Sequence, residues 1–373
     1  MEHSVAQTKQ VLGGRDVVKV AACQFPYEFL DKEKCLARTC ELIAEAARNG
    51  ADLIAFPEAW VTTYPFWSCG WEGNMAAWLQ ATVLFQDNAI VVPGDETERV
   101  CDAARRAGTC VVMGINEMDP RPGCRTVYNS LLFVGSDGSL LGTHRKLFPT
   151  FIERTFWGAG DGRSLRVFDT DIGRIGGLIC GENATLARAA LMGKGEEIHI
   201  AAYSGCFSIH KGPRLQEPGA EFLGHHLARA HSVEAGAFVV LPSGIMNAKK
   251  VPDTFPFRDS MNIAWSNGGS CIVAPGGVYL AAPDFGEQIL YAECRAEHIK
   301  AMKALIDTLG HYSRPDVFQL TVNEDTRAPA EALARAAAQR ASSMHLPDLR
   351  MLCERHGVQV EKVEALMGEL LSN

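Results

Sequence analysis

Three reactive side chains each follow, or end, an apolar segment that reads as a β-strand. Glu58 follows "DLIAF", Lys146 follows "LLGTHR", and Cys180 ends "GGLIC". In open α/β sheets, ligands bind beside the strand ends, where loops gather side chains from distant parts of the chain. A carboxylate gathered there can take the proton of a thiol, and an ammonium can stabilise the thiolate and the charge that develops on a substrate. Gly181 would let its backbone N–H approach the reacting atom as a second donor.

Each of these residues also has a plain structural interpretation. A cysteine in an apolar strand is often a core residue, and a glutamate or lysine after a strand is often a solvated surface group. The residue types therefore predict a thiol-based active site only if the chain brings the three strand ends together.

The rest of the chain predicts such an arrangement, because strand-like and helix-like segments alternate from residue 17 to residue 323. Continuous Val/Ile/Leu runs indicate strands that are covered on both faces, and the hairpin around "GSDG" adds antiparallel pairs. We therefore expect a mixed sheet covered by helices. The expected strands are 17–25, 51–59, 109–117, 128–134, 139–148, 174–180, 196–203 and 237–244, and the segments 269–283 and 287–294 are expected to close the series as an antiparallel meander. The expected helices are 31–50, 97–108, 183–195, with Asn183 as N-cap, and 219–236.

The segments around the three residues resemble the nitrilase superfamily of carbon–nitrogen hydrolases. "FPEAW" is similar to the glutamate motif of that family, "HRKLFPT" to its lysine motif and "GGLICGEN" to its cysteine motif. The likeness extends over residues 17–323. Three further stretches resemble the nitrilase branch in particular, namely "AWVTTYPFW", "ERTFWGAGDG" and "GHYSRPDV".

This resemblance implies a role for each site residue. Glu58 would be the general base, Lys146 the cationic stabiliser and Cys180 the nucleophile. Glu153 matches a second family glutamate that positions the lysine and the substrate. The chain has Gly181 where many nitrilases carry a tryptophan, which leaves the substrate preference open. Candidate substrate-binding residues near the motifs are Tyr64, Trp157, Gly181 and Tyr203.

The resemblance also implies a fold and a reaction. The family fold is a four-layer α-β-β-α sandwich that pairs across subunits, so we expect a homodimer or a larger homo-oligomer. The expected reaction converts an organic nitrile to a carboxylic acid and ammonia through a cysteine thioimidate and a thioester. It requires no cofactor, since the thiolate is the nucleophile and the site supplies the acid–base work.

Composition limits the other possibilities. The 373 residues carry a net charge of −8, which gives no electrostatic basis for binding nucleic acid or an anionic membrane. No apolar stretch approaches the roughly 20 residues of a membrane span. Twelve cysteines without framework spacing favour a reducing cytoplasm. His225 and His226 are adjacent and would point apart on a helix, so the sequence predicts no metal site.

We expect three regions: a flexible N-terminal extension over 1–16, a hydrolase domain over 17–323, and a helical C-terminal tail over 324–373. The Ala/Leu/Glu-rich tail is a candidate for building oligomers. Two other functions stay open. The first is an amidase or carbamoyl-amide hydrolase with the same triad, and the second is a non-enzymatic oligomerising protein with an idle triad. A cysteine–histidine hydrolase that uses His144 is a further alternative.

Overall fold

The computed structural model describes residues 10–70, 73–206, 222–261 and 263–324. Clustering of internal contacts divides the chain into two units, Met1–Val322 and Asn323–Asn373, and all but the first two residues of the second unit lie outside the described residues. The helical tail predicted over 324–373 therefore stays a prediction. Among the described helices, none is long and apolar enough to cross a membrane.

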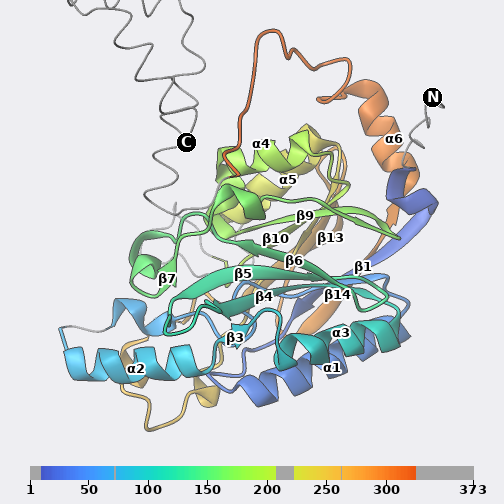
Figure 1. Cartoon of the computed structure of the whole chain (residues 1–373). Helices are drawn as coiled ribbons and strands as arrows, with labels where there is room; N and C mark the ends of the chain where they lie inside the picture. Colours follow the sequence, from blue (N-terminus) through green and yellow to red (C-terminus); the bar gives the residue numbers. More distant parts are fainter. Residues whose placement is uncertain (1–9, 71–72, 207–221, 262, 325–373) are drawn as a thin grey trace, which may run out of the picture. The chain divides into compact units, whose positions relative to one another are not determined.

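Two sheets form the centre of the first unit (Figure 1). The first sheet has the order β14-β1-β2-β4-β5-β6, with β3 paired to β4 and β7 paired to β5. Its strands are β1 (Val17–Gln24), β2 (Leu53–Ala55), β3 (Ile90–Val91), β4 (Cys110–Met118), β5 (Val127–Val134), β6 (Leu140–Arg145), β7 (Trp157–Gly158) and β14 (Gln288–Arg295).

The second sheet has the order β13-β12-β11-β10-β9-β8. Its strands are β8 (Phe168–Thr170), β9 (Gly173–Ile179), β10 (Ile198–Ala202), β11 (Phe238–Leu241), β12 (Gly268–Ala274) and β13 (Val278–Phe285). β9, β10 and β11 are parallel, as are β1, β2 and β4. The outer strands β5, β6 and β14 of the first sheet and β8, β12 and β13 of the second pair in antiparallel fashion, whereas the short strands β3 and β7 pair in parallel with β4 and β5. The predicted mixed α/β architecture is confirmed.

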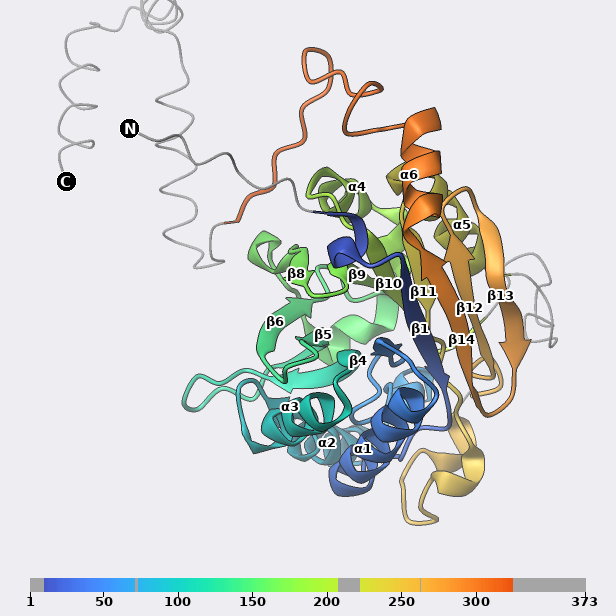
Figure 2. The ribbon, with the colours of Figure 1, turned by 90° about the vertical axis from the view of Figure 1, so that its right-hand side faces the viewer.

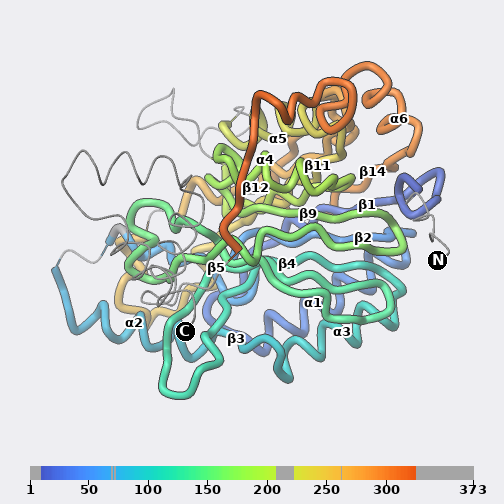
Figure 3. Tube along the Cα trace, turned by 45° about the horizontal axis from the view of Figure 1, so that its top comes forward, coloured from blue at the N-terminus to red at the C-terminus, as the bar shows by residue number. Residues whose placement is uncertain are grey.

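Helices cover the outer face of each sheet, as Figures 1 and 2 show. α1 (Lys32–Arg48) and α3 (Asp95–Ala107) lie on the first sheet, whereas α4 (Leu186–Gly193) and α5 (Leu223–Ala235) lie on the second. Because the inner faces of the two sheets pack on each other, the layers follow the order α-β-β-α. The tube in Figure 3 follows the chain through these layers.

Strand alternation explains the continuous apolar runs. In β1, Val18 and Val20 face the core between the sheets, while Ala21 and Cys23 face the core beneath α1 and α3. Strands that are buried on both faces need apolar residues at every position.

Two helices were not predicted. α2 (Met75–Asp87) buries only Ala81 and Phe85, so its apolar residues do not form the one-sided stripe that indicates a helix. α6 (Ala296–Leu305) follows β14 directly. The N-cap expected at Asn183 is wrong: α4 begins at Leu186, and the Thr185 hydroxyl accepts a hydrogen bond from the Ala187 N–H.

Candidate active site

Glu58 follows β2 and is completely buried. Its Oε1 accepts hydrogen bonds from Lys146 Nζ at 2.9 Å and from Asn129 Nδ2 at 2.7 Å. Its Oε2 accepts one from the backbone N–H of Ser204 at 3.1 Å. The carboxylate is therefore held by groups from three segments: the end of β6, the middle of β5 and the loop after β10.

A glycine makes room for the backbone of this glutamate. A Cβ on Gly114 of β4 would lie 2.1 Å from the carbonyl oxygen of Pro57 and 2.6 Å from the amide nitrogen of Ala59. Any side chain there would collide with the segment that carries Glu58, so glycine is required at this position in the strand.

Lys146 follows β6, and its ammonium group is also completely buried. Nζ lies 2.9 Å from Glu58 Oε1 and 2.8 Å from Glu153 Oε2. The other oxygen of Glu153 accepts a hydrogen bond from the Tyr64 hydroxyl at 2.8 Å, and Nζ lies 5.8 Å from the centre of the Trp157 ring. One ammonium thus bridges two carboxylates in a site lined by aromatic rings.

These contacts set the protonation of the group. Burial raises the pKa of Glu58, and the charge of Glu153 raises it further, against the opposing effects of Lys146 and Asn129. Burial would lower the pKa of Lys146, but the two carboxylates outweigh it and hold that pKa well above its usual value. The lysine therefore stays charged, and Glu58 is a stronger base than an ordinary carboxylate.

Cys180 occupies a sharp turn at the end of β9. Its φ is +52°, a region that non-glycine residues rarely adopt. The backbone then enters a short 3₁₀ turn over Cys180–Ala184. A Cβ on the following Gly181 would meet only the Thr150 hydroxyl, at 3.5 Å, so the space beside the thiol is open on that side.

The thiol is close enough to the buried charges for them to act on it. Burial raises the pKa of Cys180 well above its usual value, the charge of Glu58 adds to this, and Lys146 opposes it. The group is therefore a thiol, and its proton would have to leave for the sulfur to act as a nucleophile. Glu58, with its raised pKa, is the available base.

Glu182 fastens the backbone of two catalytic segments to each other. Its Oε1 accepts the N–H of Leu147, next to Lys146, at 2.6 Å, and its Oε2 accepts the N–H of Ile179, next to Cys180, at 3.1 Å. His144 Nε2 also contacts Oε2, at 3.0 Å. Because His144 is engaged in this way with a structural carboxylate, it is not in position to serve as the base of a cysteine–histidine hydrolase.

The structure brings most of the predicted site residues together. The contacts above link five of them: Glu58, Lys146, Glu153, Tyr64 and Trp157. The sixth, Cys180, lies close enough for the charges of Glu58 and Lys146 to shift its pKa.

Tyr203 follows β10. Its backbone carbonyl accepts the N–H of Glu58 at 3.4 Å, and its buried hydroxyl has no hydrogen-bond partner among the described residues.

Asn129, Glu182 and Ser204 were missed by sequence reasoning. Asn129 lies inside a strand, and Ser204 contributes only its backbone, so neither carries a signal in the sequence. Glu182 stood inside the cysteine motif "GGLICGEN", and its position two residues after Cys180 was the one available indication.

The comparison with known families decides the identity of this fold and site. The model of the family described as carbon-nitrogen hydrolase matches residues 19–304. The chain belongs to the nitrilase superfamily of carbon–nitrogen hydrolases. Its residue pattern and its α-β-β-α layers are those expected of this superfamily.

Several relatives of this nitrilase-superfamily hydrolase are named nitrilases. It is 34% identical to nitrilase 3 of Arabidopsis thaliana over 351 residues, which cover 89% of this chain and 95% of that protein. It is 32% identical to an aliphatic nitrilase of Rhodococcus rhodochrous over 322 residues, with 84% and 81% covered.

Solved structures share the fold at lower identity. Nit3 of Saccharomyces cerevisiae has a TM-score of 0.62 at 23% identity and covers 80% of this chain and 97% of its own. An amidase from Nesterenkonia sp. has a TM-score of 0.54 at 16% identity, covering 78% of this chain and 96% of its own. At these identities the likeness shows the fold alone.

Replacing Glu182 with Gln tests its role between the two catalytic segments. The amide keeps the size but turns one acceptor into a donor, which then faces an N–H. We expect kcat to fall at least about ten-fold with a smaller change in KM, and stability to fall by about 1–3 kcal/mol. Although burial raises the pKa of Glu182, the His144 contact and the backbone hydrogen bonds lower it overall, so its stabilising effect is present at neutral pH and lost as the pH falls below about 4.

The matched control is Glu197→Gln. Glu197 is also buried and accepts a backbone N–H, from Arg174 at 2.9 Å, but at the other end of β9. Denaturant unfolding should show destabilisation in both variants, and steady-state kinetics should show the loss of kcat in Glu182→Gln alone. An equal loss of kcat in both would contradict the role of Glu182.

Proposed function

We propose that this chain hydrolyses an organic nitrile to the corresponding carboxylic acid and ammonia. The observation that carries the proposal is the buried Glu58–Lys146–Glu153 group beside the Cys180 thiol, since these groups can accept a proton, stabilise negative charge and supply a nucleophile. The named nitrilases among the relatives, at 32% and 34% identity over most of the chain, favour a nitrile as the substrate.

The proposed reaction begins when the Cys180 sulfur adds to the nitrile carbon. The thiol proton passes to Glu58 and then to the nitrile nitrogen, which gives a thioimidate. Lys146 stabilises the negative charge that develops on this nitrogen. Glu58 next activates a water molecule, and loss of ammonia from the tetrahedral adduct leaves a thioester. A second water cleaves the thioester, which releases the acid and restores the thiol.

The substrate side chain would lie against aromatic residues. The Tyr64 ring contacts the rings of Trp157 and Trp265 edge to face, with its centre 5.5 Å from each of theirs. The hydroxyl of Tyr64 and the indole N–H of Trp157 are already bonded, to Glu153 and to Asn116 respectively. The Tyr203 hydroxyl has no partner among the described residues and is therefore the polar group we assign to the substrate.

Paired assays test the reaction. Aliphatic, aryl and arylacetic nitriles and their matching amides are each incubated with the enzyme, and ammonia and the carboxylic acid are measured. We expect turnover of at least one nitrile at a higher kcat/KM than that of its amide. A preference for every amide over its nitrile would assign the chain to the amidases instead.

Cys180 should carry the covalent intermediate. Rapid quench of the reaction followed by mass spectrometry should find the adduct on the peptide that contains Cys180, and Cys180→Ala should abolish ammonia release without unfolding the protein. Cys271→Ala, in a buried strand of the second sheet, is the control and should keep its activity. An adduct on any other cysteine would overturn the assignment.

Glu58 and Lys146 act on charge that appears only during the reaction. Their loss should therefore lower kcat far more than it raises KM, by about a hundred-fold or more. Glu58→Gln cannot take a proton, and Lys146→Arg replaces a compact ammonium with a planar group, so neither should rescue activity.

Because these residues work as a unit, the double variant should be little worse than the poorer single one. Steady-state kinetics on one accepted nitrile measure this. A kcat within a few-fold of wild type in either single variant would remove that residue from the mechanism.

A further inference from the structure

A chain of buried hydrogen bonds begins at the carbonyl of Cys180. Asn183 Nδ2 donates to the Cys180 oxygen at 3.0 Å. The other end of the same amide, Oδ1, lies 2.9 Å from His199 Nε2. Because a carbonyl can only accept, this contact fixes the orientation of the amide. Asn183 Oδ1 must therefore accept, and His199 must carry a hydrogen on Nε2.

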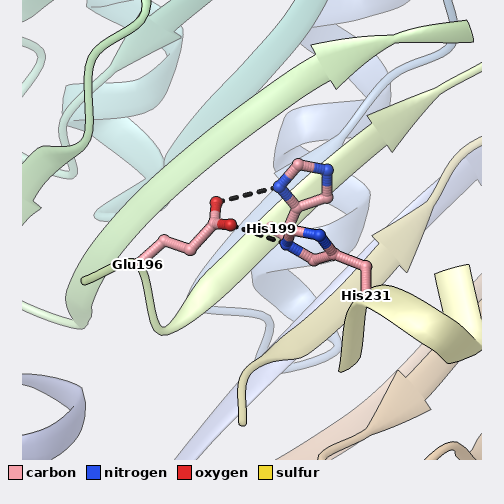
Figure 4. A group of neighbouring side chains, drawn as sticks. All are labelled: Glu196, His199 and His231. Carbon is pink, nitrogen blue, oxygen red and sulfur yellow. Dashed lines mark hydrogen bonds and ion pairs between the residues drawn. The ribbon is translucent and has the colours of Figure 1, made fainter. Parts of the chain in front are cut away.

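The chain continues to a second histidine. His199 Nδ1 lies 2.8 Å from Glu196 Oε2, and His231 Nε2 lies 2.6 Å from Glu196 Oε1, as Figure 4 shows. Glu196 lies two residues before the start of β10, which carries His199, while His231 belongs to α5. All of these side chains are at most 2% exposed, so water cannot replace any of the bonds.

Counting hydrogens shows that the group holds an additional proton. The bonds Asn183–His199, His199–Glu196 and Glu196–His231 each need one hydrogen, three in all. Two neutral imidazoles and a carboxylate supply only two. A third proton completes the bonds, and it also makes the buried group electrically neutral, which burial in a medium of low dielectric constant favours.

We assign this proton to His199, because both of its ring nitrogens face an acceptor, Nε2 facing Asn183 Oδ1 and Nδ1 facing Glu196 Oε2. Contacts with both histidines hold the pKa of Glu196 down at about 2 although burial raises it, so this group is a carboxylate. Burial and the charge of His199 lower the pKa of His231 and outweigh the opposing effect of Glu196, so this ring is neutral. Arg188 of α4, which is paired with Glu234 at 2.8 Å, also acts on His231 and lowers its pKa.

A metal ion is the competing interpretation, since the donor atoms of Glu196, His199 and His231 lie within 4.8 Å of one another. A metal on His231 Nε2 would move the hydrogen of that ring to Nδ1. That atom is buried and has no partner among the described residues, so an N–H would be left unsatisfied. Without a metal, His231 Nδ1 carries only a lone pair, so no buried N–H is left without an acceptor. The hydrogen-bonded form is therefore favoured.

The local sequence permits this group because of a glycine in β9. A Cβ on Gly176 would lie 2.2 Å from Glu196 Oε2. Only a glycine lets the carboxylate lie against the strand that ends at Cys180. The network therefore contacts the nucleophile segment twice, at Gly176 within the strand and at the Cys180 carbonyl beyond its end.

We propose that Asn183, His199, Glu196 and His231 form a positioning network for the nucleophile, in which a proton held on His199 completes the bonds that fix the turn at Cys180. The network acts through Asn183 on the carbonyl of a residue whose backbone is in a rarely adopted conformation. The proposal rests on the proposed role of Cys180, and its tests include readouts that do not depend on nitrile turnover.

The proton is tested by ¹⁵N NMR of the full-length enzyme labelled at histidine, with single His→Gln variants for assignment. We expect both nitrogens of His199 to carry hydrogen and His231 to be neutral. In Glu196→Gln, the amide can donate to His199 Nδ1 and accept from His231, so His199 should become neutral with its hydrogen on Nε2. A neutral His199 in the wild type would overturn the proposal, as would a stoichiometric metal detected by mass spectrometry.

Positioning is tested by the rate at which iodoacetamide alkylates Cys180, followed by peptide mass spectrometry. This rate reports on the turn whether or not the enzyme accepts any given nitrile. Glu196→Gln keeps every bond and should stay within about three-fold of wild type. Glu196→Leu removes the bonds to both histidines, and Asn183→Asp loses the N–H that donates to the Cys180 carbonyl. Each should change the alkylation rate at least about ten-fold, and kcat on an accepted nitrile should fall in both variants.

The control is Thr109→Val, which removes a buried hydrogen bond to the carbonyl of Ala51, 3.0 Å long, outside the network. It should lower the melting temperature without changing the alkylation rate. Should Glu196→Leu fail to fold, the nearly isosteric Asn183→Asp decides the outcome. An alkylation rate equal to that of the wild type in Asn183→Asp would overturn the positioning role. If the wild-type enzyme turned over no nitrile, only the proposed function would be overturned.

Discussion

The structure depends on one buried ammonium group held between two carboxylates. Lys146, Glu58 and Glu153 are at most 3% exposed, and moving an ion out of water costs several kcal/mol even after the surroundings relax. Their attraction offsets this cost only where the remaining oxygens are also bonded. Asn129, Ser204, Tyr64 and the N–H of Thr150 supply those bonds, so the charges dictate the neighbouring residues.

The two packed sheets bring the charged groups and the thiol together in a buried site. Glu58, Lys146 and Cys180 follow strands β2, β6 and β9, which belong to two different sheets, so the packing of one sheet on the other fixes the distance between base and nucleophile. Glu182 then ties the segments after β6 and β9 directly to each other. The close-packed core between the sheets therefore holds these residues at fixed distances more rigidly than a single loop could.

The sequence predicted which residues stand at the strand ends, but it did not predict the contacts between them. Continuous apolar strands predicted a mixed sheet covered by helices, and the family resemblance carried by three motifs implied the four layers and the groups at Glu58, Lys146 and Cys180. The bonds from Asn129 to Glu58 and from His231 to Glu196 join residues 71 and 35 positions apart, and no local pattern encodes such pairs. The prediction of Asn183 as a helix cap is wrong, although asparagine is a common capping residue. Its side-chain Nδ2 instead donates a hydrogen bond to the Cys180 carbonyl.

The same charges explain why the resting nucleophile is a neutral thiol. With two carboxylates and one ammonium already buried, a thiolate would add a second net negative charge, and the pKa of Cys180 is raised accordingly. In the proposed reaction the sulfur would become anionic only as its proton passes to Glu58, whose own pKa burial also raises. Proton transfer and attack on the substrate would thus be coupled in this reaction, with charge developing where Lys146 can stabilise it.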